Sequence, residues 1–299
     1  MSANLFKRLV RFTPRSNTSS ILIGQPVKDE IDVGLALRND TEVQVNVFSG
    51  NSVLNPGQST GRVEIIHKIF SPLAANEVGT IRCIGLNYKR HADEVSMELP
   101  PIPTMFMKPS TALGDPWPTP TLIPKVSQKD GSSDFESELA VILGKTAKNV
   151  LEAEAMEYVL GYSACNDVSS RESQLAQSQW SFSKGFDGAW RQVSVLCRRI
   201  TYRLGKDLVP DPTKFRIRGS KNGKVMQESK LDDLIFGIPR LIAFLSQSTT
   251  LPAGTIIITG TPAGVGMGRT PKERLDAGDE FHVEILPHIG TLVNIFQIE

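Results

Sequence analysis

A short apolar run preceded by two acids is the strongest structural constraint in this sequence. The run, LAVIL at 139–143, follows directly after Glu136 and Glu138. A continuous apolar run of this length is typical of a strand buried on both faces. Residues two apart on a strand point to the same face, so the two glutamates would lie side by side, with Asp134 on the same face. Neighbouring carboxylates repel one another unless a cation lies between them. The segment therefore predicts a buried strand whose acidic end either holds a metal ion or faces water.

Strand-like segments dominate the first quarter of the chain. In residues 1–75 they are separated by Gly and Asn, as in small antiparallel sheets, and DVGLAL (32–37) is among the segments that we expect to form strands. The polar stretch at 71–80 has the composition of a linker. We therefore predict a small N-terminal β-rich domain over 1–75 and a larger domain over 76–299.

Helix-like segments are few in the larger domain. Apolar spacing predicts helices at about 88–96, over 151–162 and over 232–247, the last interrupted at Gly237-Ile238-Pro239. These helices do not alternate regularly with the strands, so a doubly wound parallel sheet is not expected. The predicted fold class is a mixed, mainly-β α+β fold.

Charge and cysteine content argue against several classes of function. Lys and Arg total 33 against 32 Asp and Glu, a net charge of +1, so no overall field favours nucleic acid or a membrane surface. The three cysteines, Cys83, Cys165 and Cys197, are far apart, which fits neither a zinc site nor a disulfide framework. No apolar run is long enough to span a bilayer. The basic, serine-rich and acid-free residues 1–20 leave two predicted locations, the cytoplasm first and the mitochondrion as the alternative.

Two groups of polar residues carry candidate chemistry. Asp167 ends another apparent strand, and with Glu136 and Glu138 it would form an all-oxygen site suited to Mg²⁺, Mn²⁺ or Ca²⁺. The alternative for these acids is a set of solvated strand ends. His91 and Glu94 are three residues apart, which places both on one face of a helix, where the carboxylate could orient the imidazole as a general base. The alternative for this pair is an ordinary surface contact.

Two glycine-containing segments add candidates for binding oxygen atoms. Lys184, in SFSKGFDG, could hold an enolate or carboxylate oxygen near a metal ion, although alone it is typical of a surface lysine. The loop ITGTPAGVGMGR has neither the P-loop nor the dinucleotide-binding context. Its backbone N–H groups and the Thr261 hydroxyl are therefore expected to receive a small anion.

Taken together and in this order, these segments resemble the fumarylacetoacetate hydrolase family. The resemblance runs from about residue 80 to the end and rests on IGLNYKRHADE, MFMKPST, DFESELAVILGK, GYSACNDVSSRESQ, SKGFD and GTIIITGTPAGVG. It implies a mostly β roll with flanking helices, a homodimer, and one divalent metal, Mg²⁺ or Mn²⁺, per subunit. With its small N-terminal domain, the chain is most similar to the subgroup of fumarylacetoacetate hydrolase domain-containing proteins and acylpyruvases.

Carried over by position, the resemblance implies a role for each candidate residue. The expected metal ligands are Glu136, Glu138 and Asp167, the expected catalytic residues are His91, Glu94 and Lys184, and the expected substrate-binding residues are Arg171, Gln174 and Thr261. Trp190 and Arg191 replace an apolar, proline-containing stretch of the family pattern, which suggests an unusual substrate.

The implied reaction is metal-dependent hydrolysis of a C–C bond in a 2,4-dioxo acid such as an acylpyruvate, through an enolate that the metal stabilises. The alternative is an oxaloacetate-type decarboxylase or a keto–enol isomerase on the same scaffold, since these need the metal and the enolate but no attacking water. A non-catalytic binding relative is a second alternative. The expected partners are a small 2-oxo acid and a second copy of the chain, without nucleic acid or membrane.

Overall fold

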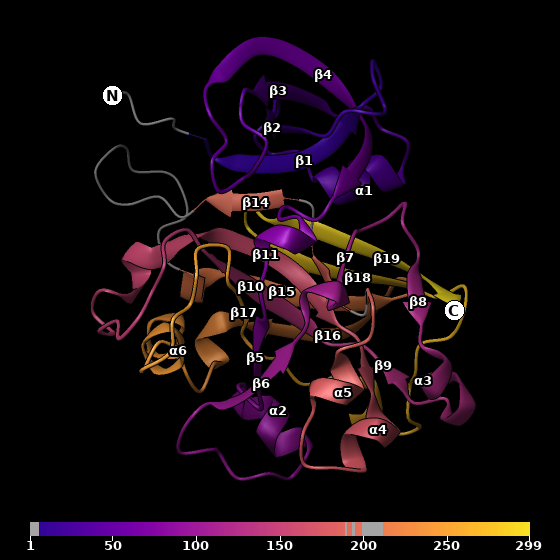
Figure 1. Ribbon diagram of the computed structural model, residues 1–299. Coiled ribbons are helices and arrows are strands. Elements are labelled where there is room, and N and C mark those ends of the chain that lie inside the picture. Colours follow the sequence, from indigo (N-terminus) through magenta and orange to yellow (C-terminus); the bar gives the residue numbers. More distant parts are fainter. Residues whose placement is uncertain (1–5, 189, 193–194, 199–211) are drawn as a thin grey trace.

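Figure 1 shows the computed structural model, which describes residues 6–188, 190–192, 195–198 and 212–299. The strands are β1 (Arg8–Pro14), β2 (Leu22–Pro26), β3 (Gln44–Phe48), β4 (Ser59–Phe70), β5 (Ile81–Gly85), β6 (Thr104–Lys108), β7 (Leu113–Gly114), β8 (Thr121–Ile123), β9 (Ser133–Asp134), β10 (Ser137–Leu143), β11 (Val159–Asp167), β12 (Ser169–Ser170), β13 (Trp190–Gln192), β14 (Val195–Arg198), β15 (Arg216–Lys221), β16 (Lys224–Lys230), β17 (Ile256–Ile258), β18 (Glu280–Leu286) and β19 (Gly290–Ile298). The helices are α1 (Val33–Arg38), α2 (Lys89–Glu94), α3 (Lys125–Asp130), α4 (Arg171–Leu175), α5 (Ser181–Lys184) and α6 (Ile238–Leu245), with 3₁₀ turns at Ala75–Glu77, Ser110–Ala112, Ala155–Tyr158, Pro212–Lys214, Leu231–Asp233 and Gly266–Gly268.

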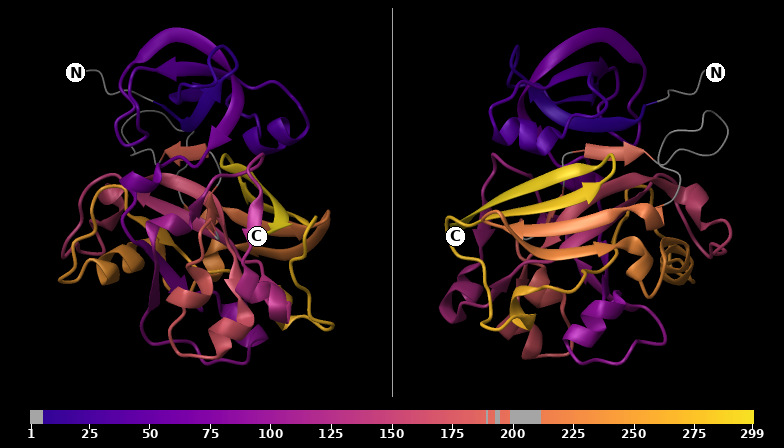
Figure 2. Two further views of the ribbon diagram at one scale, coloured as in Figure 1. Left: turned by 45° about the vertical axis from the view of Figure 1, so that its right-hand side comes forward. Right: turned by 180° about the vertical axis from the view of Figure 1, so that it is seen from behind.

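Two sheets packed on one another form the body of the molecule. The 12-stranded sheet has the order β2-β3-β4-β1-β14-β11-β10-β17-β5-β6, with β13 pairing with β11 and β7. The five-stranded sheet has the order β16-β15-β18-β19-β8 and packs on β10 and β11 (Figure 2). Between the sheets the rings of Phe135 and Phe281 stack with centroids 4.5 Å apart. The fold is thus mixed and dominated by sheet, and it lacks the regular strand–helix alternation of a doubly wound protein.

Strand β10 confirms the prediction of a buried strand. Every residue from Ser137 to Leu143 is buried, because β11 and β17 pair along its two edges and the smaller sheet covers one face. Glu136 and Glu138 are only 6% and 2% exposed. The alternative of a solvated strand end is therefore wrong, and the acids lie in the protein interior.

The N-terminal strands continue the larger sheet. Strands β1 to β4 and α1 lie together at one end of the molecule, and β1 pairs with β14, for example Leu9 with Leu196 (Figure 1). Helices α2, α4 and α5 lie at the opposite end (Figure 1). The division into domains at residue 75 stays a prediction, since the backbone hydrogen bonding crosses from one proposed unit to the other.

Three segments differ from the predicted secondary structure. Residues 33–38, expected as a strand, form α1, because the Asp32 carboxylate accepts a hydrogen bond from the Leu35 N–H and caps the helix. The helix predicted over 151–162 is wrong: a 3₁₀ turn ends at Tyr158, and strand β11 follows, held by its ladder to β10. Pro239 does not interrupt a helix but lies in the first turn of α6, where a missing N–H costs nothing.

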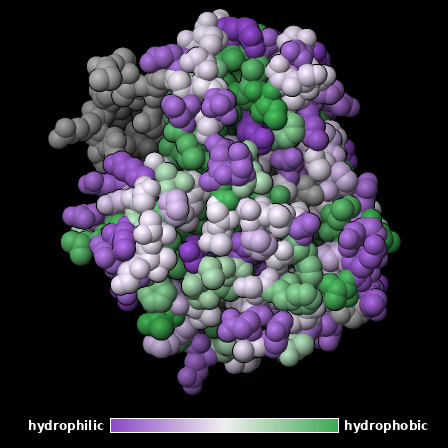
Figure 3. Space-filling model, in the orientation of Figure 1, coloured by the Kyte–Doolittle hydropathy of each residue, from purple (hydrophilic) through white to green (hydrophobic). Residues whose placement is uncertain are grey.

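The surface gives little guidance to function. On the face shown in Figure 3, hydrophilic and hydrophobic residues are interspersed. Within the described residues, no helix is long and apolar enough to cross a membrane. Cys83 and Cys165 are buried free thiols.

Asp32 connects α1 to the five-stranded sheet, which leads to a stability prediction. Its carboxylate caps α1 and also accepts hydrogen bonds from the Thr291 N–H and Oγ1, at 3.2 and 2.7 Å. Asp32→Ala leaves these donors without a partner and should lower the free energy of unfolding by about 1–3 kcal/mol in urea titrations. Glu30→Ala is the control, because Glu30 is exposed and should have little effect. Equal stabilities of the two variants would contradict the role of Asp32.

Candidate active site

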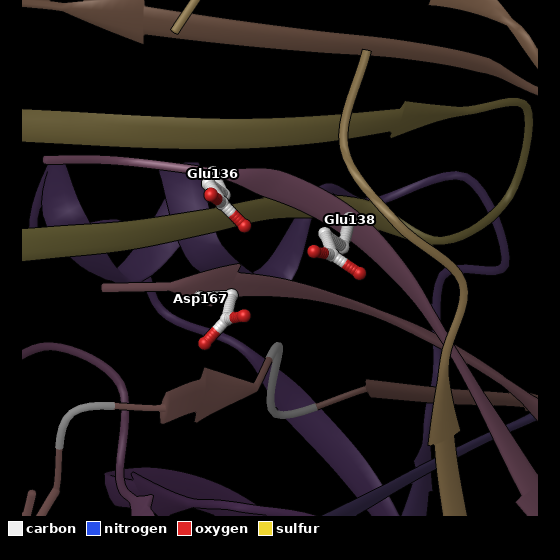
Figure 4. Close-up of side chains that lie close together, drawn as sticks. All are labelled: Glu136, Glu138 and Asp167. Atoms are coloured by element: carbon white, nitrogen blue, oxygen red, sulfur yellow. The ribbon is translucent and has the colours of Figure 1, made fainter. Parts of the chain in front are cut away.

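Three acids from neighbouring strands converge at the end of the larger sheet. Glu136 precedes β10, Glu138 lies within it, and Asp167 ends the antiparallel neighbour β11. The Asp167 N–H donates to the Glu136 carbonyl at 2.9 Å, which fixes the two strand ends side by side. One carboxylate oxygen from each acid lies within 4.8 Å of the others, and the three side chains lie close together (Figure 4). The structure thus brings together all three predicted metal ligands.

Buried basic side chains neutralise part of this acid cluster. Lys184 Nζ lies 2.6 Å from Glu136 Oε2 and 3.0 Å from Asp167 Oδ2, and Arg171 Nη1 lies 2.7 Å from Glu136 Oε1. Burial opposes ionisation of Glu136, but the positive charges of Lys184 and Arg171 outweigh it and lower its pKa to about 2. Lys108, which is fully buried, donates to Asp167 Oδ1 at 2.6 Å. Sequence reasoning assigned no role to Lys108, because nothing in MFMKPST shows that β6 brings it to the end of β11.

Glu138 is the acid that lacks a basic partner. Among the described residues it forms no ion pair, and its Oε2 accepts only the Gly260 N–H, at 2.6 Å. Burial and the negative charges of Asp167 and Glu136 raise its pKa well above the usual range. A cation bound between the three acids would offset this repulsion. An all-carboxylate donor set suits a hard divalent ion such as Mg²⁺ or Mn²⁺, so the residues fit the metal that the family resemblance implies.

The glycine-rich loop after β17 holds carboxylates of the chain itself. The Gly260 N–H binds Glu138, and the Gly264 N–H donates to Glu94 Oε1 at 2.8 Å. Gly260 and Gly264 have φ values of +95° and +107°, which side chains rarely allow. Thr261 lines the adjoining pocket, but its hydroxyl donates to the Ser137 carbonyl and accepts from Gln227. A role for Thr261 in binding substrate stays a prediction.

The loop also holds Asp134, which lies beside the acid cluster. The N–H groups of Gly266 and Met267 donate to its two carboxylate oxygens at 2.8 and 3.0 Å. Arg171 Nε donates to Asp134 Oδ2 at 2.8 Å, so Arg171 bridges Asp134 and Glu136. One loop therefore fixes both the surroundings of the acid cluster and the position of Glu94.

His91 and Glu94 form the predicted pair on α2. His91 Nδ1 lies 2.8 Å from Glu94 Oε2, and both side chains are mostly buried. A proton on Nδ1 facing the carboxylate leaves Nε2 free to accept a proton, which is the arrangement of a general base. His91 lines the same pocket as Glu136 and Glu138.

Arg171 and Gln174, predicted to bind substrate, lie on α4 at the pocket. Arg171 Nη1 donates to Gln174 Oε1 at 2.8 Å as well as to Glu136. Its Nη2 is buried without a hydrogen-bond partner in the described residues. Trp190 and Arg191 lie on β13, paired with Asp167 and Asn166, but their side chains fall outside the described part of the chain.

The pocket that these groups share is lined by both charged and apolar side chains. It contains about 660 Å³ of empty space, part of it open to solvent. The charged residues of its lining include His91, Glu136, Glu138, Arg171 and Lys184. Its apolar residues, here called the apolar wall, include Val95, Met97, Phe106, Leu175, Trp180 and Met267. Such a site can bind an anionic carbonyl compound at a cation and place a base beside it.

Comparisons with known proteins agree with this geometry. The chain is 41% identical to the caffeoylpyruvate hydrolase of Neonothopanus nambi over 301 residues, covering 99% of this chain and 95% of that protein. It is 35% identical to the oxaloacetate tautomerase YisK of Bacillus subtilis (strain 168) over 230 residues, covering 76% and 72%. The crystal structure of a 5-carboxymethyl-2-hydroxymuconate delta-isomerase from Mycobacterium smegmatis superposes with a TM-score of 0.76 at 26% identity, covering 98% and 100%.

The match to a family is equally extensive. Residues 80–297 match the C-terminal region of fumarylacetoacetate (FAA) hydrolase, the same span in which the ordered motifs occur. The match includes every residue placed around the acid cluster. The chain therefore belongs to the fumarylacetoacetate hydrolase family.

Proposed function

We propose that this protein is a divalent-metal-dependent hydrolase that cleaves a C–C bond in an acylpyruvate, a 2,4-dioxo acid. The observation that carries the proposal is one pocket lined both by Glu136 and Glu138 of the acid cluster and by His91, which is paired with Glu94. The similarity to a caffeoylpyruvate hydrolase over nearly the whole chain supports the same reaction class.

The chain's own residues would divide the work as follows. Glu136, Glu138 and Asp167 would hold the metal, which when bound supplies Lewis-acid polarisation of the 2-oxo acid. His91 would accept a proton at Nε2 from a water molecule that attacks the C4 carbonyl, and Glu94 would hold the imidazole in that tautomer.

Bond cleavage then follows from the attack of water. The C3–C4 bond breaks, C4 leaves as a carboxylic acid, and the electron pair passes to C3 to give the enolate of pyruvate. Lys184 is placed by Glu136 and Asp167 to stabilise the negative charge that develops on the enolate oxygen. A proton on C3 completes the reaction and gives pyruvate.

An oxaloacetate tautomerase or decarboxylase is the second candidate function. The similarity to an oxaloacetate tautomerase over 76% of the chain favours it. These reactions need the same enolate but no attacking water. The His91–Glu94 pair therefore favours the hydrolase.

A substrate panel tests the proposal. Acetylpyruvate, fumarylpyruvate, oxaloacetate and fumarylacetoacetate are each supplied with Mg²⁺ or Mn²⁺, and the products are followed by absorbance and chromatography. We expect an acylpyruvate to give pyruvate and the free acid, and a chelator to stop the reaction. Conversion of oxaloacetate alone would replace the hydrolase with the second candidate. Failure to bind oxalate in calorimetry with Mg²⁺ would favour a non-catalytic protein.

A further inference from the structure

We infer that the pocket selects an acylpyruvate whose acyl group is bulky and apolar, with a flat aryl group seated against Trp180. The inference rests on the proposed function and adds to it the chemical class of the group attached to C4. Trp180 would be a specificity-determining residue, since it faces the part of the substrate that the acid cluster does not hold.

The lining of the pocket combines a group of charged side chains with a group of apolar ones. The acidic and basic side chains gather around Glu136, whereas Trp180, Phe106 and Leu175 belong to the apolar wall. Leu175 and Met97 are 68% and 54% exposed, which leaves their apolar surface accessible to a ligand. A ligand that fills this pocket must therefore combine an anionic head with an apolar tail.

Contacts with Gly85 and Phe106 fix the position of the Trp180 ring. Its ring packs so closely on Gly85 that a Cβ there would lie 2.2 Å from Trp180 Cζ3. The ring also meets Phe106 edge to face, with centroids 5.6 Å apart. Trp180 thus presents a fixed, flat surface, which favours stacking of another flat ring.

Phe106 lies against both Trp180 and Lys184. Lys184 Nζ lies 5.4 Å from the centroid of the Phe106 ring, and Trp180 contacts the same ring edge to face. A substrate whose enolate oxygen reaches Lys184 would therefore extend past Phe106 with its C4 substituent near Trp180.

The pocket offers few basic side chains to a second carboxylate of the substrate. Among the described residues that line the pocket, the basic side chains are His91, Arg171 and Lys184, and each already contacts an acid of the chain. A distal carboxylate, as in fumarylpyruvate, would lose water against the apolar wall. Arg171 Nη2 lacks a hydrogen-bond partner in the described residues, but it is buried on the side chain that already bridges Asp134 and Glu136. Dicarboxylates should therefore be poorer substrates than aryl compounds.

Relative rates of three acylpyruvates test the inference. In the Mg²⁺-loaded enzyme, kcat/KM should be at least about tenfold higher for benzoylpyruvate than for acetylpyruvate, and lowest for fumarylpyruvate. Trp180→Ala should remove most of the preference for benzoylpyruvate, mainly through KM, and Trp180→Phe should keep it. Phe182→Ala is the matched control, because Phe182 is an exposed aromatic residue outside the pocket lining and should leave the ratio unchanged. A wild-type preference for fumarylpyruvate, or an unchanged ratio in Trp180→Ala, would overturn the inference.

A binding experiment separates this inference from the proposed reaction. 2-Oxo-4-phenylbutanoate, 2-oxopentanoate and 2-oxoadipate lack the C4 carbonyl and cannot be hydrolysed, so calorimetry with Mg²⁺ reports selection alone. The phenyl compound should bind at least about tenfold more tightly than the other two, and less so in Trp180→Ala. If this preference is found while no dioxo acid is cleaved, the specificity stands and the hydrolase proposal fails. If acylpyruvates are cleaved but the three ligands bind equally, only the specificity fails.

Discussion

Glu138→Gln is expected to abolish Mg²⁺ binding and turnover while the protein stays folded. Among the residues that the structure describes, Glu138 is the one acid of the cluster without a basic partner, so its charge is the part of the site that a metal must balance. Glutamine keeps an oxygen that can accept the Gly260 N–H but removes the negative charge. Removing one partner of a buried charge interaction costs about 3–5 kcal/mol, which corresponds to a loss of at least about 100-fold in metal affinity. Calorimetric titration with Mg²⁺ and Mn²⁺ measures it directly.

Glu136→Gln is the matched variant, because it removes the same charge from an acid that has basic partners. Lys184 and Arg171 both contact Glu136, so this change should also lower the free energy of unfolding without metal, by about 1–3 kcal/mol. Glu138→Gln removes a repulsion from Asp167 and Glu136 and should not destabilise the metal-free protein. Thermal unfolding with and without Mg²⁺ distinguishes the two. A normal Mg²⁺-dependent rise in Tm for Glu138→Gln would show that the metal lies elsewhere.

The local parts of the site could be predicted from sequence, and the long-range parts could not. The alternation of side chains along a strand correctly places Glu136 and Glu138 on one face. The helical spacing correctly pairs His91 with Glu94. By contrast, Asp167 joins the cluster through the register of β10 with β11, which no spacing within one segment reveals. From sequence, Asp167 is a candidate ligand only because it is an acid at the end of an apparent strand, and the family resemblance adds to that hypothesis.

The errors have the same physical origin. The apolar spacing in 151–162 suggests a helix, but pairing with β10 makes Val159–Asp167 a strand, so a non-local ladder overrides a local pattern. Lys108 and Trp180 reach the site from β6 and from the loop between α4 and α5, and each is placed by contacts with distant segments. The homodimer and the effect of Trp190 and Arg191 on substrate choice stay predictions.

His91→Ala is expected to lower acylpyruvate hydrolysis by about 10²–10⁴-fold, the usual contribution of a general base. It should spare part of any decarboxylation of oxaloacetate, because loss of CO₂ needs no activated water. The test is the ratio of the two activities in one preparation, with Mg²⁺ affinity measured alongside to confirm that the acid cluster is intact. An equal loss of both activities would contradict a role for His91 in activating water.

Gly268→Ala tests the same pair without removing either side chain. A Cβ at Gly268 would lie 2.7 Å from Glu94 Cδ, so the flexible Glu94 side chain must move away from His91 Nδ1 and the Gly264 N–H. Hydrolysis should then fall in the same direction as in His91→Ala, again with oxaloacetate decarboxylation less affected, because Glu94 no longer orients the imidazole. Gly79→Ala is the control, since a Cβ at Gly79 meets nothing within 4 Å. If Gly268→Ala hydrolyses acylpyruvates at the rate of this control, the hydrogen bond from Glu94 is not needed for His91 to act as a base.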